Sequence, residues 1–169
     1  LVEKDVLAIS NHYRNNGFRD VNVSYNVEYL KNDKINIYFN IKEGNKYNFS
    51  EIKISDNKNI IKKDLQIKID NEFKVFLEKS KLYSINNIGN LEQKISDLLI
   101  QNGLEFFEIN LLEEIKQYDV AVIFEISSIK PKYTKQINIF GNYRTFDYVI
   151  RRELSIIEGD AIHSTQIKK

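Results

Sequence analysis

Residues 93–109 read QKISDLLIQNGLEFFEI, and they decide the fold because a weaker copy, LAISNHYRNNGFRDVNV, occupies residues 7–23. Ile9-Ser10 matches Ile95-Ser96, and Asn16-Gly17 matches Asn102-Gly103. The segment after each copy is also repeated, at nearly the same spacing, and so is one further segment along the chain. Their matched residues are Ile35, Ile37, Phe39 and Ile41 with Val120, Val122, Phe124 and Ile126, and Ile52 and Ile54 with Ile137 and Ile139. A shared period of about 85 residues favours tandem small domains over a solenoid, whose repeats are shorter.

The first half of one period predicts a strand followed by two helices. Residues 46–55 alternate apolar and polar side chains, as a half-buried strand does, and residues 60–69 predict a short helix. A longer helix is expected to begin after the N-cap Ser84 and to end at Gly103, with one apolar stripe formed by Leu91, Ile95, Leu98 and Leu99.

The second half of the period predicts a hairpin. Residues 105–114 and 119–127 form its strands, and the second strand is apolar on both faces, which places it in the middle of the sheet and the first at the edge. The unit is therefore β-α-α-β-β, an α+β fold in which two helices pack on one face of a three-stranded mixed sheet.

The repeat divides the chain into three parts. Residues 1–45 are expected to be the C-terminal part of one unit, residues 46–131 a complete unit, and residues 132–169 the N-terminal part of a third. In the third part, residues 136–140 predict a strand. Thr145 is the expected N-cap of a short helix that Glu158-Gly159 closes, and Asp147 lies near the positive end of its dipole.

Composition excludes several functions. The 169 residues carry a net charge of +1 and no cysteine, so neither a strong electrostatic field for nucleic acid nor a disulfide or thiolate site is expected. His12 and His163 are the only histidines and have no spaced ligand or acid partner; we interpret them as a helix-surface residue and a loop residue. We expect no enzyme activity, no metal and no cofactor.

Two motifs resemble a known family. Glu43-Gly44-Asn45-Lys46-Tyr47 enters the central unit, and residues 141–160 read GNYRTFDYVIRRELSIIEGD. Together with the tandem β-α-α-β-β units they resemble POTRA (polypeptide-transport-associated) domains, and in particular the third to fifth domains of the periplasmic arm of BamA-type outer-membrane assembly proteins. Residues 55–60 and 101–109 depart from the family pattern within the central unit.

The resemblance implies a function, a location and partners. It implies a scaffold at the periplasmic face of a Gram-negative outer membrane that binds unfolded outer-membrane polypeptides, docks accessory lipoproteins and continues into its own membrane barrel outside this chain. The matching helix of the family's last domain meets an accessory lipoprotein, which points to Arg151, Arg152 and Glu158 as partner-docking residues.

The predicted edge strands indicate where a polypeptide could bind. Residues 21–30 form a long predicted edge strand without proline and with little charge, and residues 106–112 are its counterpart in the central unit. Such edges invite strand addition through main-chain hydrogen bonds, unless a loop or neighbouring domain covers them. The residues assigned to this peptide-binding edge are Val21, Asn22, Val23, Ser24, Tyr25, Asn26, Val27, Phe106, Phe107, Glu108 and Ile109.

Two alternatives remain open from the sequence. One is a POTRA arm of a two-partner secretion protein or related transporter. The other is a nucleic-acid-binding module of the KH type, but KH domains need a Gly-x-x-Gly loop and the glycines here are never three apart. We therefore expect no nucleic-acid partner.

Overall fold

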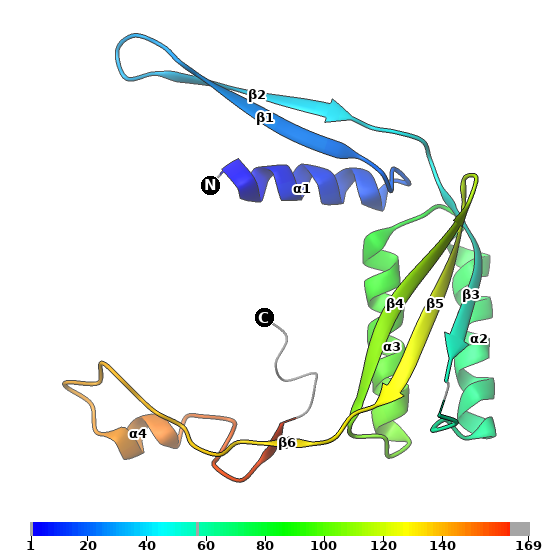
Figure 1. The fold of residues 1–169 in the computed structure, drawn as a ribbon, viewed down its shortest axis with the longest axis vertical. Coiled ribbons are helices and arrows are strands. Elements are labelled where there is room, and N and C mark those ends of the chain that lie inside the picture. Colours follow the sequence, from blue (N-terminus) through cyan, green and yellow to red (C-terminus); the bar gives the residue numbers. More distant parts are fainter. Residues whose placement is uncertain (1, 57, 163–169) are drawn as a thin grey trace.

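The computed structural model describes residues 2–56 and 58–162. In the first part of the chain, helix α1 (Val2–Asn15) is followed by strands β1 (Asn22–Tyr29) and β2 (Ile35–Lys42), which pair as an antiparallel hairpin. Helix α1 lies along this hairpin, and both lie at one end of the central unit (Figure 1).

The central unit has the predicted order of elements. It consists of β3 (Asn48–Ser55), α2 (Lys63–Lys79), α3 (Ile85–Gln101), β4 (Phe107–Lys116) and β5 (Asp119–Ser128). The sheet order is β3-β5-β4, with β3 parallel and β4 antiparallel to β5. The mixed three-stranded sheet with two helices on one face is thus confirmed, as are the central place of β5 and the edge place of β4.

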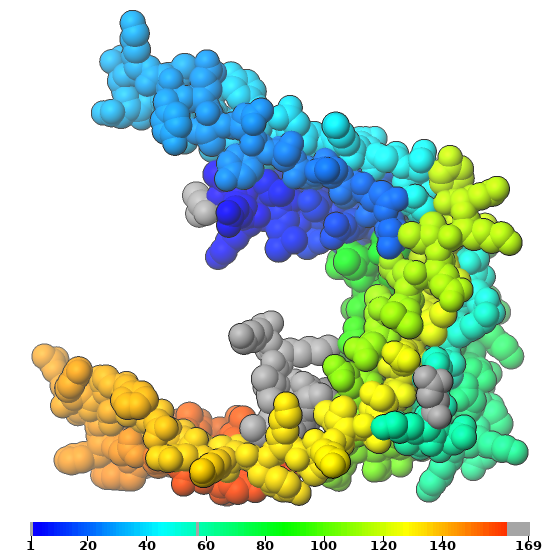
Figure 2. Space-filling model, viewed as in Figure 1, coloured from blue at the N-terminus to red at the C-terminus, as the bar shows by residue number. Residues whose placement is uncertain are grey.

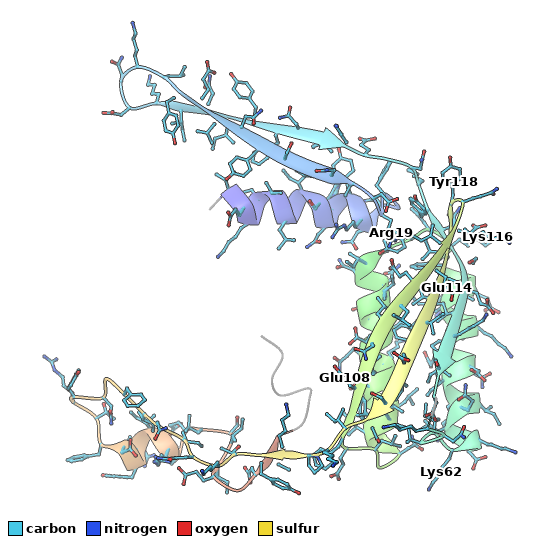
Figure 3. The ribbon with its side chains drawn as sticks, viewed as in Figure 1. Arg19, Lys62, Glu108, Glu114, Lys116 and Tyr118 are labelled. Carbon is cyan, nitrogen blue, oxygen red and sulfur yellow. The ribbon has the colours of Figure 1, made fainter. Side chains whose placement is uncertain are left out.

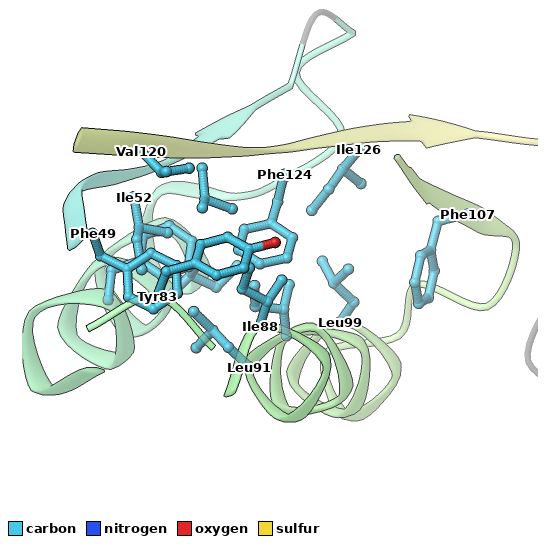
Figure 4. Packing of buried hydrophobic residues seen from close by; sticks show 14 of the residues in the cluster. Phe49, Ile52, Tyr83, Ile88, Leu91, Leu99, Phe107, Val120, Phe124 and Ile126 are labelled. Carbon is cyan, nitrogen blue, oxygen red and sulfur yellow. The ribbon is translucent and has the colours of Figure 1, made fainter. Parts of the chain in front are cut away.

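The core lies between this sheet and its two helices. Figure 4 shows Phe124 and Ile126 pointing from β5 toward the helices, where Ile88, Leu91 and Leu99 meet them. Phe124, Ile95 and Leu99 are fully buried, and Phe73 stacks on Phe124 at 5.9 Å between ring centroids. Burying such side chains stabilises the unit by about 2 kcal/mol each.

Helix α3 follows the sequence prediction closely. Ser84 adopts an extended backbone, and its Oγ accepts a hydrogen bond from the Asn87 N–H at 3.3 Å, so it is the expected N-cap. Gly103 follows the helix with a positive φ of 86°, a conformation that favours glycine. Helix α2 differs, since it runs to Lys79 rather than ending near residue 69, and Ile60 and Ile61 pack on the core from the loop before it.

The first part of the chain buries less than its counterpart. The inward residues of β5 are buried, whereas the matching residues of β2, Ile35, Ile37, Phe39 and Ile41, are 37 to 52% exposed. Helix α1 contributes no fully buried residue, and no described helix equivalent to α2 lies beside it. The difference has a simple cause: β5 is covered by two helices and flanked by two strands, while β2 pairs with β1 alone among the described strands, and α1 contacts the hairpin through β1.

The last part lies at the opposite end of the central unit (Figure 1). It contains β6 (Lys132–Tyr133), the five-residue helix α4 (Asp147–Arg151) and β7 (Ala161–Ile162), with β6 antiparallel to β7. The three parts form an open arc in the space-filling view (Figure 2).

Two predictions for this last part are wrong. Residues 136–140 form no strand, because no described strand lies beside them and side chains bind the backbone of Ile137 instead. Phe146 rather than Thr145 occupies the N-cap of α4, with no side-chain cap hydrogen bond. Asp147 does lie in the first turn, as expected.

Candidate functional site

Strand β4 presents an open edge whose hydrogen-bonding groups alternate. The Ile129 N–H donates to the Phe106 carbonyl at 3.1 Å, and these residues are opposite each other in the register that continues through β4 and β5. In an antiparallel ladder every second residue bonds to the partner strand. The main-chain groups of Ile109, Leu111 and Glu113 therefore point away from β5, while those of Glu108 and Asn110 bond to it.

Strand β1 repeats this arrangement in the first part of the chain. The Leu30 N–H donates to the Lys34 carbonyl at 2.8 Å, which sets the same alternation along the β1–β2 pair. The main-chain groups of Val23, Tyr25 and Val27 consequently point away from β2.

The structure divides the predicted edge residues into two groups. Val23, Tyr25, Val27, Phe107 and Ile109 have outward main-chain groups, whereas the even-numbered members, Asn22, Ser24, Asn26 and Glu108, use theirs to hold the hairpins together. Val21 is buried before β1 begins, and the Phe106 carbonyl accepts from Ile129. Which residues have outward main-chain groups depends on the pairing register, so the sequence alone did not show this alternation. The register also adds two residues to the β4 edge: Leu111, which lies within the predicted segment 106–112, and Glu113, which lies beyond it.

A joint of charged and aromatic side chains connects the first part of the chain to the central unit. Arg19 Nε donates to Glu113 Oε2 at 2.7 Å, and Arg19 Nη1 donates to Asp20 Oδ1 at 2.7 Å. Tyr83 donates its hydroxyl to Glu113 Oε1 at 2.9 Å, so both carboxylate oxygens of Glu113 are occupied. Figure 3 places Arg19 where the segment after α1 approaches the central unit.

Asp20 and Tyr47 form a second contact in the joint. The Tyr47 hydroxyl donates to Asp20 Oδ2 at 2.5 Å, and the Tyr47 N–H donates to the Gly17 carbonyl at 2.9 Å. The hydrogen bond from Tyr47 lowers the pKa of Asp20, burial opposes this, and Arg19 lowers the pKa further. Burial and Glu113 raise the pKa of Tyr83, so this phenol stays protonated and keeps donating.

The helix ends of the two parts also meet. Asn15, the last residue of α1, uses Oδ1 to accept hydrogen bonds from the Asn86 N–H at 2.9 Å and from Ser84 Oγ at 3.2 Å. The first turn of α3 is therefore capped partly from the preceding unit. Gly17 is buried with a φ of 95°, and a Cβ there would lie 2.7 Å from Leu82 Cδ1. Gly17 and Tyr47 fall in segments that the sequence singled out, but nothing in the sequence shows that they meet, because the members of the joint are scattered over about 100 residues.

Two of the predicted docking residues, Arg151 and Glu158, are brought together by hydrogen bonds within the chain. Arg151 does not point freely outward: Nε donates to Asp147 at 2.6 Å, Nη1 to Glu158 at 3.2 Å and Nη2 to the Ile137 carbonyl at 2.7 Å. Glu158 also accepts from the Ile137 N–H at 3.0 Å, which is the first cause of its lowered pKa. Arg152 is exposed and pairs with Glu153.

Exposed aromatic side chains lie close to this cluster in sequence. Phe140, Tyr143, Phe146 and Tyr148 are 66 to 97% exposed, and Phe146 stacks on Tyr148 at 5.9 Å. Exposed aromatic residues beside arginine are the composition found at the centres of protein interfaces.

No chemical centre emerges from residues 2–56 and 58–162. His12 lies exposed on α1, as interpreted from the sequence, and His163 falls outside the described residues. In the described part of the chain, no three His, Cys, Asp or Glu side chains are grouped so as to hold a metal ion. Of the helices described, none has both the length and the apolar character to cross a membrane.

Comparisons with known proteins agree with this architecture. A family model described as "POTRA: Surface antigen variable number repeat" matches residues 1–44. Outer membrane protein assembly factor BamA of Nitratidesulfovibrio vulgaris is 24% identical over 100% of this chain and 21% of its own length. BamA of Neorickettsia risticii is 26% identical over 98% of the chain and 22% of its length. The chain thus spans about a fifth of the curated relatives it matches.

Solved structures show the same fold. The crystal structure of Haemophilus influenzae BamA POTRA3-5 superposes with a TM-score of 0.65 at 18% identity, covering 98% of this chain and 65% of that one. BamA from Haemophilus ducreyi lacking POTRA domains 1-3 gives a TM-score of 0.58 at 12% identity, covering 79% of this chain and 23% of that one.

Fold and sequence together point to one class: residues 1–44 match the POTRA family model, and the chain has the fold of tandem POTRA domains. Within that class it is similar to BamA, since its BamA relatives match over 98 to 100% of the chain and BamA POTRA3-5 has the same fold. The resemblance recognised from the motifs is therefore confirmed.

Proposed function

We propose that the chain is part of the periplasmic arm of an outer-membrane protein assembly factor, where it binds unfolded outer-membrane polypeptides by strand addition. In this proposal residues 1–45, 46–131 and 132–169 belong to three successive domains, corresponding to the third to fifth of the arm. The observation that carries strand addition is the pair of open edges on β1 and β4, whose outward main-chain groups recur at every second residue.

Main-chain pairing suits this role because its hydrogen bonds do not depend on the side chains of the bound polypeptide. An arm that handles many clients needs binding that tolerates different sequences, and it needs affinity low enough for release. The exposed, alternating surface of β1 and β4 offers this without any covalent step or cofactor.

The edges are tested by peptide titration of the isotope-labelled chain. An extended peptide with alternating apolar and polar residues should shift the amides of Val23, Tyr25, Val27, Ile109 and Leu111. A peptide N-methylated on the bonds facing the edge is the control, and it should not bind. Shifts caused by a single-stranded RNA oligomer instead would overturn the proposal.

Proline substitutions separate strand addition from binding to a sheet face. Leu111→Pro removes an outward N–H, so it should abolish peptide binding at β4 while the β4–β5 ladder stays intact. Asn110→Pro is the matched variant, and it should destabilise the central unit because its N–H bonds to β5. Unchanged peptide binding by a folded Leu111→Pro variant would exclude addition at this edge.

We further propose that Arg151, Arg152 and Glu158 dock an accessory lipoprotein. The internal bonds of Arg151 to Glu158, Asp147 and Ile137 order the surface, and Arg152 with the neighbouring exposed aromatics makes the contact. Tyr148→Ala and Arg152→Glu should each weaken binding of the purified lipoprotein from the same organism by tenfold or more, about 1.4 kcal/mol. Lys130→Glu, an exposed charge before β6, is the control.

A further inference from the structure

A cleft of about 920 Å³ lies between the first part of the chain and the central unit. One wall is formed by Ser10 and Arg14 of α1 and by residues 21–23 at the start of β1. The opposite wall is formed by residues 111–113 of β4, and Tyr83 and Ile85 also line the cleft. Residues of both proposed peptide-binding edges, β1 and β4, therefore line the same cleft.

Some of the charged side chains in the cleft are hydrogen-bonded within the chain, and Arg14 differs from them. Arg19 bonds to both Asp20 and Glu113, and each of these carboxylates also accepts a tyrosine hydroxyl. Arg14 lines the cleft near enough to act on the pKa of Asp20 and of Tyr83, yet its side chain makes no hydrogen bond or ion pair with any described residue. Arg14 thus has a full set of guanidinium donors available to a ligand.

Apolar side chains and main-chain groups of β4 line the same cleft as Arg14. Leu111 and Leu112 are 40% and 48% exposed at the cleft wall. The main-chain groups of Leu111 and Glu113 point away from β5 by the alternation of the ladder. An extended peptide added to β4 would consequently run into the cleft and bring its side chains within reach of Arg14.

We propose that this cleft fixes the register of a polypeptide added to β4 by binding an acidic side chain next to an apolar one. Arg14 holds the carboxylate of the bound segment on the face of the sheet that carries Leu111 and Glu113. Because successive strand residues point to opposite faces, the apolar residue beside the carboxylate contacts Leu112 on the other face. The two arginines and two carboxylates of the cleft sum to zero charge, so the selection acts at contact range rather than by long-range attraction. This inference rests on strand addition at β4 and adds a sequence preference to it.

The test compares two peptides on two proteins. An alternating apolar/polar peptide with one central Glu, and the same peptide with Gln, are titrated against the full chain and against Arg14→Gln. A charged hydrogen bond is worth about tenfold in affinity, so the Glu peptide should bind the native chain about tenfold more tightly, and the difference should vanish in Arg14→Gln. Arg144→Gln, at an exposed arginine of the last part, is the control and should retain the preference.

The outcomes separate this inference from the proposed function. If both peptides bind the native chain equally and still shift the β4 amides, strand addition stands and the role of Arg14 is wrong. If Arg14→Gln weakens both peptides equally, the residue does not read the carboxylate, and the inference also fails. If neither peptide shifts the β4 amides, strand addition itself fails. An unchanged amide spectrum of free Arg14→Gln shows that the variant is folded.

Discussion

Arg19 and Glu113 are 94 residues apart in sequence, and their side chains are joined by a hydrogen bond of 2.7 Å between Nε and Oε2. Glu113 belongs to the edge strand β4, and Arg19 to the turn before the edge strand β1. The same pair also contributes to the wall of the cleft that contains Arg14. The contact that connects two units therefore also sets the distance between their two open edges.

Replacing Arg19 should loosen the joint without unfolding the central unit. In Arg19→Gln, Glu113 keeps Tyr83 but loses its charged partner, and the two side chains are only 26% and 14% exposed. Losing a partly buried charged hydrogen bond should lower the local stability by about 1–2 kcal/mol. Amide exchange of Tyr47, whose N–H donates to Gly17, should quicken, while exchange at the buried Val122 should not change.

Arg152→Gln is the matched control for this prediction, because Arg152 is 69% exposed and bonds only its neighbour Glu153 among the described residues. An exposed ion pair of this kind contributes at most about 1 kcal/mol. Equal exchange rates at Tyr47 in native chain and Arg19→Gln would mean that the joint does not depend on the ion pair.

Gly17→Ala should weaken the joint more than Gly103→Ala weakens its own turn. Both glycines have positive φ, 95° and 86°, so both variants lose the conformational freedom of glycine at a cost of about 1 kcal/mol. Only at Gly17 does the new Cβ meet a neighbour, Leu82 Cδ1 at 2.7 Å, whereas nothing lies within 4 Å at Gly103.

Urea unfolding of both variants measures the difference. Leu82→Ala combined with Gly17→Ala should recover the part due to crowding, because the leucine side chain is then absent. A Gly17→Ala variant no less stable than Gly103→Ala would show that Leu82 moves aside freely.

Acid should weaken the joint through Asp20. The pKa of Asp20 in the folded chain is lowered, first by the hydrogen bond from Tyr47, with burial opposing and Arg19 assisting. A carboxyl group with a lowered pKa stabilises the fold above its unfolded value, about 3.9, and this contribution is lost as the pH falls through the folded value. Stability should therefore decline below about pH 4.

Asp20→Asn isolates this effect. The difference in thermal stability between the native chain and Asp20→Asn should be constant near pH 6 and should shrink as the pH falls below about 4. A difference that is independent of pH down to about 2 would contradict the role of Asp20, whatever other carboxylates do over that range.

The parts of the fold that the sequence predicted are those set by local rules. Helix α3 followed from a capping serine, an apolar stripe and a terminal glycine, and β5 followed from a strand apolar on both faces. Helix α2 was predicted too short because Ile60 and Ile61 were counted as its first turn, whereas its stripe of Leu65, Ile69 and Phe73 begins later and continues toward Lys79.

The parts that sequence reasoning missed depend on tertiary partners. Residues 136–140 repeat the apolar pattern of β3, but a strand forms only beside another strand, and β3 has β5. Arg14, Arg19 and Glu113 carry no local pattern that separates them from the other charged residues of the chain. Their roles depend on the approach of two units, which no periodicity encodes.

Arg151→Lys should disorder the last part of the chain even though it keeps the charge. One guanidinium reaches Asp147, Glu158 and the Ile137 carbonyl through three different nitrogens, and a lysine ammonium cannot match that planar geometry. Glu158 then loses its partner, so its hold on the Ile137 N–H weakens. Amide exchange of Ile137 should quicken several-fold, consistent with a local loss of about 1 kcal/mol.

Arg152→Lys is the control for Arg151→Lys, because the Arg152 side chain makes a single bond to Glu153 and bonds to no backbone group in the described residues. It should leave the exchange of Ile137 unchanged and should also leave lipoprotein binding largely intact, since the charge remains. If Arg151→Lys leaves Ile137 protected, Glu158 alone holds this segment, and Glu158→Gln should then produce the loss expected for Arg151.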